Sequence, residues 1–110
     1  MIGRRKPKRD PVTPELVEAL ERRDIGCVLA FLQNGHECTD RWGDPCSWKF
    51  LHNPWAITVE HVKSDLRMGV RAPSDLAHTV LLCAGTNIGV PSRTQRNLMR
   101  HYLEIVRFAA

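Results

Sequence analysis

The chain has 110 residues, of which 43% are hydrophobic and 25% charged. These proportions are ordinary for one globular domain of common size. No apolar run approaches the roughly 18 residues that a membrane-spanning helix requires, so we expect no membrane partner. The first residues are charged and no apolar segment follows them, so we expect no secretory signal and a cytoplasmic location.

The net charge of +4 and the pI of about 9.2 favour an anionic partner, and nucleic acid is the first candidate. Residues 1–12 are basic and contain two prolines, so we expect a flexible arm there and one domain over residues 13–110. The basic groups at the two ends are either solvated or contact phosphates, with release of counterions. The candidate nucleic-acid-binding residues are Arg4, Arg5, Lys6, Arg93, Arg96 and Arg100.

The first expected element is a helix over about residues 14–23. Thr13 is a good N-cap, Pro14 suits the first helical position, and an apolar stripe follows. The next run, residues 27–32, is continuously apolar, and this pattern predicts a buried strand.

Residues 36–54 contain one glycine, two prolines, two cysteines and two tryptophans, Trp42 and Trp48. This composition predicts a long loop. Such a loop in a small domain has to be held down by tryptophan packing, by metal ligation or by both. We expect Trp42, Trp48 and the following Trp55 to be core or loop anchors.

The remaining elements predict an α+β fold. Residues 56–62 alternate between apolar and polar, which predicts a strand, and residues 80–83 predict a second, buried strand. Asn87 should lie on a short helix or turn after it. Ser92 and Gln95 form a capping box before a last helix over about residues 93–108.

Two strand-like runs carry side chains suited to hydrolysis. Glu60 and His61 are adjacent on the first run, His78 precedes the second, and Asn87 follows it. Neighbouring strand residues point to opposite faces, so Glu60 and His61 can have different tasks. The pattern predicts a small metal-assisted hydrolytic site.

Residues 55–87 resemble the HNH endonuclease motif, whose fold is the ββα-metal (His-Me) finger. In that family an acid or histidine precedes a histidine at the end of a strand, as Glu60-His61 does here. An asparagine, replaced here by His78, then precedes an apolar run and a cysteine, Cys83. Asn87 stands at the family's final histidine or asparagine. Short HNH-like bacteriophage proteins are particularly similar, which implies a ββα-metal core with an added N-terminal helix and a long C-terminal helix.

The resemblance implies a DNA endonuclease that hydrolyses phosphodiester bonds. His61 would be the general base, and Glu60 and Asn87 would ligate one divalent ion. Oxygen ligands favour Mg²⁺ or Mn²⁺, with Zn²⁺ or Ni²⁺ as further candidates. His78 would orient the base or ligate the metal. The expected partner is DNA, the protein would act as a monomer or homodimer, and a phage-encoded chain would work in the host cytoplasm.

The cysteines depart from the family pattern. Many HNH proteins hold a structural zinc with two Cys-x-x-Cys pairs, but Ala30 and Thr86 occupy the second position of each pair here. A substitute zinc site can be drawn from Cys27 and Cys83 together with one or two other residues. The alternative is that the thiols are simply buried in the core. For the substitute zinc site, the one or two further ligands would come from His36, Cys38 and Cys46.

Two other functions remain open. The chain can be a catalytically degenerate HNH-fold module that binds DNA or a host or phage protein. It can also be a small zinc-stabilised structural protein without a nucleic-acid role.

Overall fold

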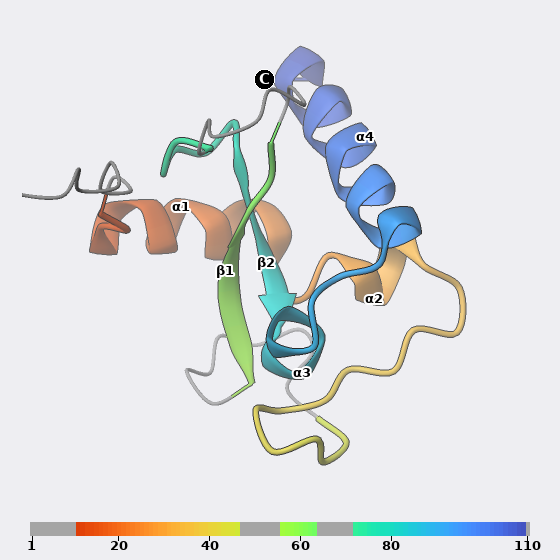
Figure 1. Ribbon diagram of the computed structural model, residues 1–110. Helices are drawn as coiled ribbons and strands as arrows, with labels where there is room; N and C mark the ends of the chain where they lie inside the picture. The colour runs from red at the N-terminus through yellow and green to blue at the C-terminus, as the bar shows by residue number, and fades with distance from the viewer. Residues whose placement is uncertain (1–10, 47–55, 64–71, 110) are drawn as a thin grey trace, which may run out of the picture.

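The computed structural model describes residues 11–46, 56–63 and 72–109, in which helices surround one small sheet (Figure 1). The expected α+β class is confirmed. Among these residues, no helix has the length and apolar character needed to cross a bilayer. In chain order the elements are α1 (Pro14–Asp24), α2 (Leu29–Leu32), β1 (Ile57–His61), β2 (Thr79–Cys83), α3 (Ala84–Ile88) and α4 (Arg93–Ala109).

Strands β1 and β2 form an antiparallel pair whose register runs from Ile57 opposite Cys83 to His61 opposite Thr79. Every residue of β2 is buried, whereas most of β1 is half-buried. Figure 1 shows α1 crossing behind this pair, α4 standing beside it and α3 continuing from the end of β2. Both strands expected from the sequence are confirmed, as is the short helix that carries Asn87.

Helix α1 begins as the sequence predicts. The Thr13 side chain accepts a hydrogen bond from the backbone N–H of Leu16 (3.1 Å), which satisfies one of the free donors of the first turn. The apolar stripe buries Leu16 and Leu20 in the core.

The edge of β2 that faces away from β1 is covered by the end of α1. The buried carboxylate of Asp24 accepts the backbone N–H of Leu81 (2.9 Å), and Arg23 Nη2 donates to the carbonyl of Thr79 (2.5 Å). The N–H of Val28 donates to the Leu81 carbonyl (2.9 Å). These groups form the hydrogen bonds that a third strand would otherwise provide. Without them, the backbone groups at this edge of β2 would be unpaired.

The strand expected over residues 27–32 is wrong. Val28 makes one hydrogen bond to β2, and the chain then turns into the short helix α2, in which Leu32 N–H donates to the Val28 carbonyl (3.0 Å). A short apolar run fits a buried strand and a buried helical turn equally well. Packing decides here, because α2 fills the space against α4.

Helix α4 has the expected capping box. Gln95 N–H donates to Ser92 Oγ (3.1 Å), and Ser92 N–H donates to Gln95 Oε1 (2.9 Å). Met99 and Leu103 of α4 are buried in the hydrophobic core, which also contains residues of both strands. The expected C-terminal helix is therefore confirmed.

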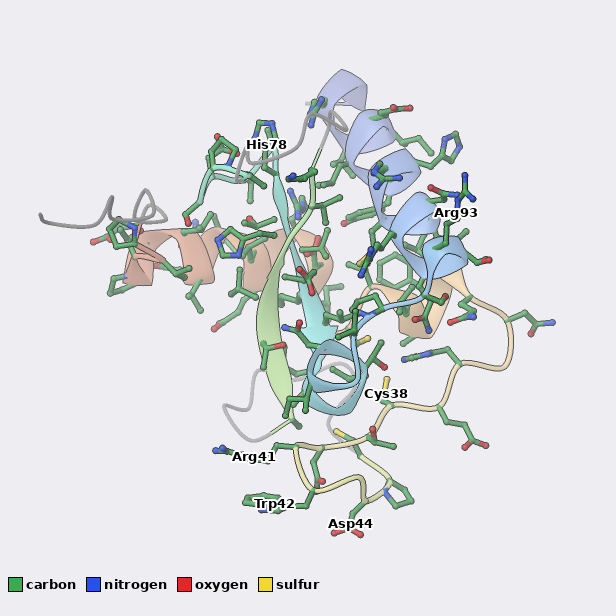
Figure 2. All side chains as sticks on the ribbon, in the orientation of Figure 1. Cys38, Arg41, Trp42, Asp44, His78 and Arg93 are labelled. Atoms are coloured by element: carbon green, nitrogen blue, oxygen red, sulfur yellow. The ribbon has the colours of Figure 1, made fainter. Side chains whose placement is uncertain are left out.

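The loop after α2 is closed by an isolated bridge between Thr39 and Pro45. Trp42 lies at its outer tip (Figure 2) with 66% of its surface exposed. The expectation that Trp42 packs in the core is therefore wrong, and its role as a loop anchor stays a prediction. The described part of the loop is held by the backbone pairing of Thr39 with Pro45. Trp48, Trp55 and residues 1–10 of the expected basic arm lie outside the described residues.

Candidate functional site

Three cysteines and one histidine converge where β2 meets α3. Cys27 follows α1, His36 and Cys38 come from the loop after α2, and Cys83 ends β2. One ligand atom from each lies within 4.8 Å of those of the other three. His36 Nε2 is 3.8 Å from Cys27 Sγ and 3.5 Å from Cys83 Sγ.

These separations fit a tetrahedral metal ion. Zn–S bonds of about 2.3 Å and Zn–N bonds of about 2.0–2.1 Å at the tetrahedral angle place sulfur and nitrogen about 3.6 Å apart. The two nitrogen–sulfur distances bracket that value. Three sulfurs and one imidazole are also a common donor set for structural zinc. The cluster could therefore bind a metal, and its chemistry favours zinc.

Backbone contacts bring the four ligands together. Cys27 is placed by the hydrogen bond of its neighbour Val28 to β2. The Cys38 loop is placed by the N–H of Gly85, which donates to the Thr39 carbonyl (3.0 Å). A Cβ atom at position 85 would lie 1.7 Å from Thr39 Oγ1 and 3.0 Å from the Asp40 carbonyl oxygen. Only glycine allows α3 and this loop to approach so closely.

The three cysteines of the cluster are buried, with Cys27 and Cys83 fully enclosed and Cys38 7% exposed, and His36 is half-buried. The Cys27 and Cys38 thiols donate hydrogen bonds to the Cys83 sulfur, which lowers the pKa of Cys83 far below its usual range. The pKa of Cys38 is raised by its hydrogen bonds to Cys27 and Cys83 and by burial. The close packing of the three sulfurs therefore makes the pKa values of these thiols differ, and metal binding would release protons from the thiols that carry them.

Two neighbouring positions explain the departure from paired Cys-x-x-Cys ligands. Ala30 turns with α2 and packs against the core, and Thr86 places its hydroxyl 2.9 Å from Cys83 Sγ. His36 and Cys38 would supply the two remaining ligands from the loop. Cys46 is not part of the four-residue cluster, although its N–H donates to the Cys38 carbonyl (2.9 Å).

A second group of polar residues lies along β1. The Thr58 hydroxyl donates to the Leu82 carbonyl (3.0 Å), and its oxygen accepts the side-chain N–H of Asn87 (2.7 Å). Because the Thr58 hydrogen is committed to Leu82, Asn87 must present its NH₂ group to Thr58. Its carbonyl oxygen is then directed elsewhere. Glu60 lies two residues beyond Thr58 and therefore on the same face of the strand.

The two histidines are held by consecutive residues of the turn before β2. His61 Nε2 lies 2.8 Å from Ser74 Oγ, and His78 Nδ1 lies 2.7 Å from Asp75 Oδ1. The His78 carbonyl also accepts the N–H of Val62 (2.7 Å). Both histidines are thus at the end of the hairpin opposite the cysteine cluster.

The structure brings the predicted site residues together only in part. Glu60 lies on the same strand face as Thr58, the residue that Asn87 contacts. Because neighbouring strand residues alternate in direction, His61 points to the other face. Among the described residues, the hydrogen bond of the Asn87 side chain goes to Thr58, and none joins it to either histidine.

The predicted nucleic-acid-binding residues differ in their exposure. Arg93 and Arg96 are exposed near the start of α4, and Arg93 is labelled in Figure 2. Arg100 is half-buried and donates to the carbonyl of Lys63 (3.0 Å). Arg4, Arg5 and Lys6 lie outside the described residues.

Sequence reasoning missed the residues that hold the others in place. Thr58 and Ser74 are ordinary in a strand and a loop, and Asp24 reads only as the end of a helix. An acidic residue at a helix C-terminus interacts unfavourably with the helix dipole. The position of Asp24 was therefore weak evidence that its carboxylate has a specific hydrogen-bonding partner. Its partners Leu81 and Tyr102 lie far away in the chain and could not be inferred.

Comparisons of the chain with protein-family models, curated proteins and solved structures found no match. The HNH resemblance is therefore a hypothesis that rests on residues of this chain alone.

Proposed function

We propose that this protein is a metal-dependent DNA endonuclease of the HNH type. The observation that carries the proposal is the orientation of the Asn87 amide by Thr58. It leaves a carbonyl oxygen on the strand face that also carries Glu60. An amide oxygen and a carboxylate are suitable ligands for a hard divalent cation such as Mg²⁺ or Mn²⁺.

In this proposal each residue has one task. Glu60 and Asn87 hold the divalent ion, which would offset negative charge on the scissile phosphate. His61 takes a proton from the attacking water, because a neutral imidazole is a suitable base near pH 7. The Ser74 hydroxyl fixes the orientation of the His61 ring. His78, held by Asp75, borders the same end of the hairpin.

The cysteine cluster has a supporting task. Cys83 ends β2 and is followed at once by α3, which carries Asn87. A zinc ion bound by Cys27, His36, Cys38 and Cys83 would fix the start of α3 and with it the Asn87 position. Structural zinc commonly replaces a large hydrophobic core in small domains.

The test is cleavage of supercoiled plasmid DNA by the purified protein with Mn²⁺ or Mg²⁺. The wild type is expected to nick the plasmid, and His61→Ala to reduce the rate at least ~100-fold, the usual contribution of a general base. His101→Ala is the matched control, because His101 is an exposed histidine of α4 and should have no effect. Intact plasmid with Mn²⁺, Mg²⁺, Ni²⁺ and Zn²⁺ alike would exclude the nuclease.

One observation favours a second function. His61 Nε2 is already hydrogen-bonded to Ser74, so a water must compete with this hydroxyl for that nitrogen. A catalytically degenerate HNH-fold module that binds DNA or a host or phage protein would tolerate this bond. For such a module, the wild type and His61→Ala would bind DNA or a specific protein equally well, and neither would cut the plasmid.

A further inference from the structure

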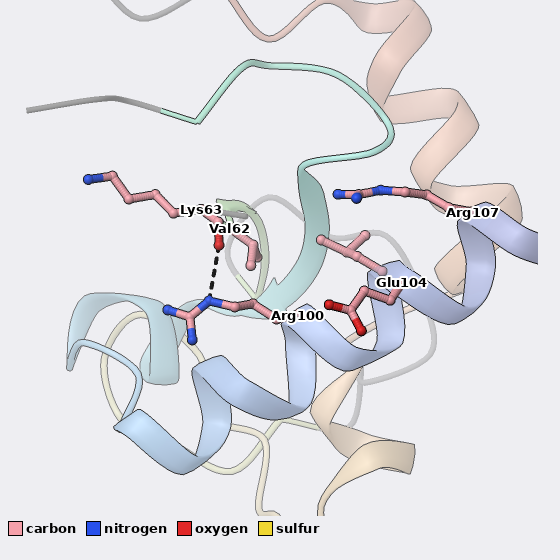
Figure 3. A pocket seen from close by; sticks show the side chains of 6 residues that line it. Val62, Lys63, Arg100, Glu104 and Arg107 are labelled. Carbon is pink, nitrogen blue, oxygen red and sulfur yellow. Dashed lines mark hydrogen bonds between the residues drawn. The ribbon is translucent and has the colours of Figure 1, made fainter. Parts of the chain in front are cut away.

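A small pocket lies between α4 and the end of β1, and charged side chains dominate its rim (Figure 3). Three of these side chains are cationic and one is acidic, so the rim carries a net positive charge. Val62 and Leu103 form its apolar floor. The charged residues are Lys63, Arg100, Arg107 and Glu104.

The two arginines are held in position by the hairpin and its preceding turn. Arg100 Nε donates to the Lys63 carbonyl (3.0 Å), and Arg107 Nη2 donates to the Ala77 carbonyl (2.8 Å). Arg100 also donates to Asn97 Oδ1 (2.7 Å). A guanidinium group has five N–H donors, so these bonds fix its direction and leave others for a ligand. Pre-orientation lowers the entropy lost on binding.

The pocket adjoins the proposed catalytic residues. Val62 follows His61 directly, and its N–H donates to the carbonyl of His78 (2.7 Å). Ala77, which receives Arg107, directly precedes His78. Because successive residues of a strand alternate in direction, Val62 points to the same face as Glu60. A ligand held by these arginines would therefore lie on the strand face of the proposed metal ligand Glu60, next to the backbone of both histidines.

Two features indicate a polymer backbone as the ligand. The pocket volume of about 20 Å³ suits one water molecule, so a phosphate group is too large to enter it. A phosphate would instead lie across the mouth of the pocket, as the backbone of a nucleic-acid strand can. Arg93, Arg96, Arg100 and Arg107 also recur at helical spacing and form one stripe along α4. The stripe extends the positive surface from the pocket toward the start of the helix.

We propose that Lys63, Arg100 and Arg107 form a surface that binds the phosphate backbone of a DNA strand, next to the bond that the proposed nuclease would cleave. This inference rests on the proposed function for its substrate class. Among the described residues of the rim, Glu104 is the one acidic group, and it lowers the affinity that the three cations provide.

The test measures binding of a fluorescent DNA duplex by anisotropy over a range of chloride concentrations without added divalent ions. Arg107→Gln and Lys63→Gln are each expected to weaken binding roughly five- to tenfold near 0.1 M salt. Each should also reduce the slope of log K against log salt by about 1, the value for one lost phosphate contact. Arg22→Gln on α1 is the matched control, because Arg22 is exposed and forms its ion pair with Glu18 among the described residues. This substitution changes the net charge equally.

Glu104→Gln gives a result that misfolding cannot imitate. It should strengthen DNA binding severalfold, because removing the acidic group lowers repulsion of the phosphate. Inorganic phosphate, compared with chloride at equal ionic strength, should displace no DNA. Displacement by low millimolar phosphate would instead assign the pocket to a free phosphate and overturn the proposal.

Failure of this inference can be distinguished from failure of the proposed function. If the wild type nicks plasmid but Arg107→Gln, Lys63→Gln and Arg22→Gln share one salt slope, the phosphate site is wrong and the nuclease stands. If the slopes fall as expected but no ion supports cleavage, the phosphate site stands and the nuclease is wrong.

Discussion

At the scale of single residues, the candidate site depends on a threonine, Thr58, that has no proposed catalytic or metal-binding role. Thr58 links Leu82 of one strand to Asn87 of the following helix and thereby decides which end of the amide faces outward. Glu60 and Asn87 could be proposed from the sequence, because their spacing resembles that of the HNH motif. Thr58 could not be proposed in this way, since threonine is common in any strand.

Thr58 is therefore expected to be a positioning residue. Thr58→Val removes the acceptor for Asn87 and should raise the Mn²⁺ concentration needed for half-maximal cleavage about 10- to 100-fold, as loss of a group that orients a metal ligand does. Thr58→Ser keeps the hydroxyl and should restore the wild-type requirement. Nuclease rates over a Mn²⁺ series test this, and an unchanged requirement in Thr58→Val would rule the role out.

At the scale of elements, the two-stranded sheet is stable because side chains complete it. Asp24 accepts hydrogen bonds from Leu81 N–H, from Arg23 and from the hydroxyl of Tyr102 (2.5 Å). Burial and this bond raise the pKa of Tyr102 above its usual range. One buried carboxylate thus joins α1, β2 and α4. The sequence predicted these three elements but not their junction, because its partners are far apart in the chain.

Replacing the carboxylate should loosen all three elements at once. Asp24→Asn places an NH₂ group among donors and leaves Arg23 without its charged partner, so we expect a loss of about 3 kcal/mol in the free energy of unfolding. Tyr102→Phe removes one donor and should cost about 1 to 2 kcal/mol. Urea denaturation followed by tryptophan fluorescence measures both values, and equal midpoints for Asp24→Asn and wild type would contradict the role.

At the scale of the whole molecule, the cysteine cluster ties the first half of the chain to the second. The sequence named Cys27, Cys83, His36 and Cys38 among its candidate ligands, because two of them stand at zinc-binding positions of the resembled family. It could not separate Cys38 from Cys46, since both lie in one irregular loop. The structure separates them, because Thr39 docks on Gly85 and draws Cys38 inward.

The cluster is expected to hold one zinc ion per chain. Cys83→Ser should abolish stoichiometric zinc, and chelation should lower the melting temperature of the wild type by roughly 15 °C, equivalent to about 3 kcal/mol. Cys46→Ser is the matched control and should keep both the zinc and the melting temperature. Elemental analysis and thermal melts test this, and full zinc occupancy in Cys83→Ser would exclude the cluster as the metal centre.

The order in which the chain is made gives this cluster a further consequence. About half of the sequence lies between Cys27 and Cys83, so the first three ligands leave the ribosome long before the fourth. The candidate metal centre could close only after β2 has emerged, when the entropy of closing a long loop must be overcome. Until then Cys27, His36 and Cys38 would form an incomplete metal site. Zinc supply during synthesis should therefore influence how much chain reaches the native state.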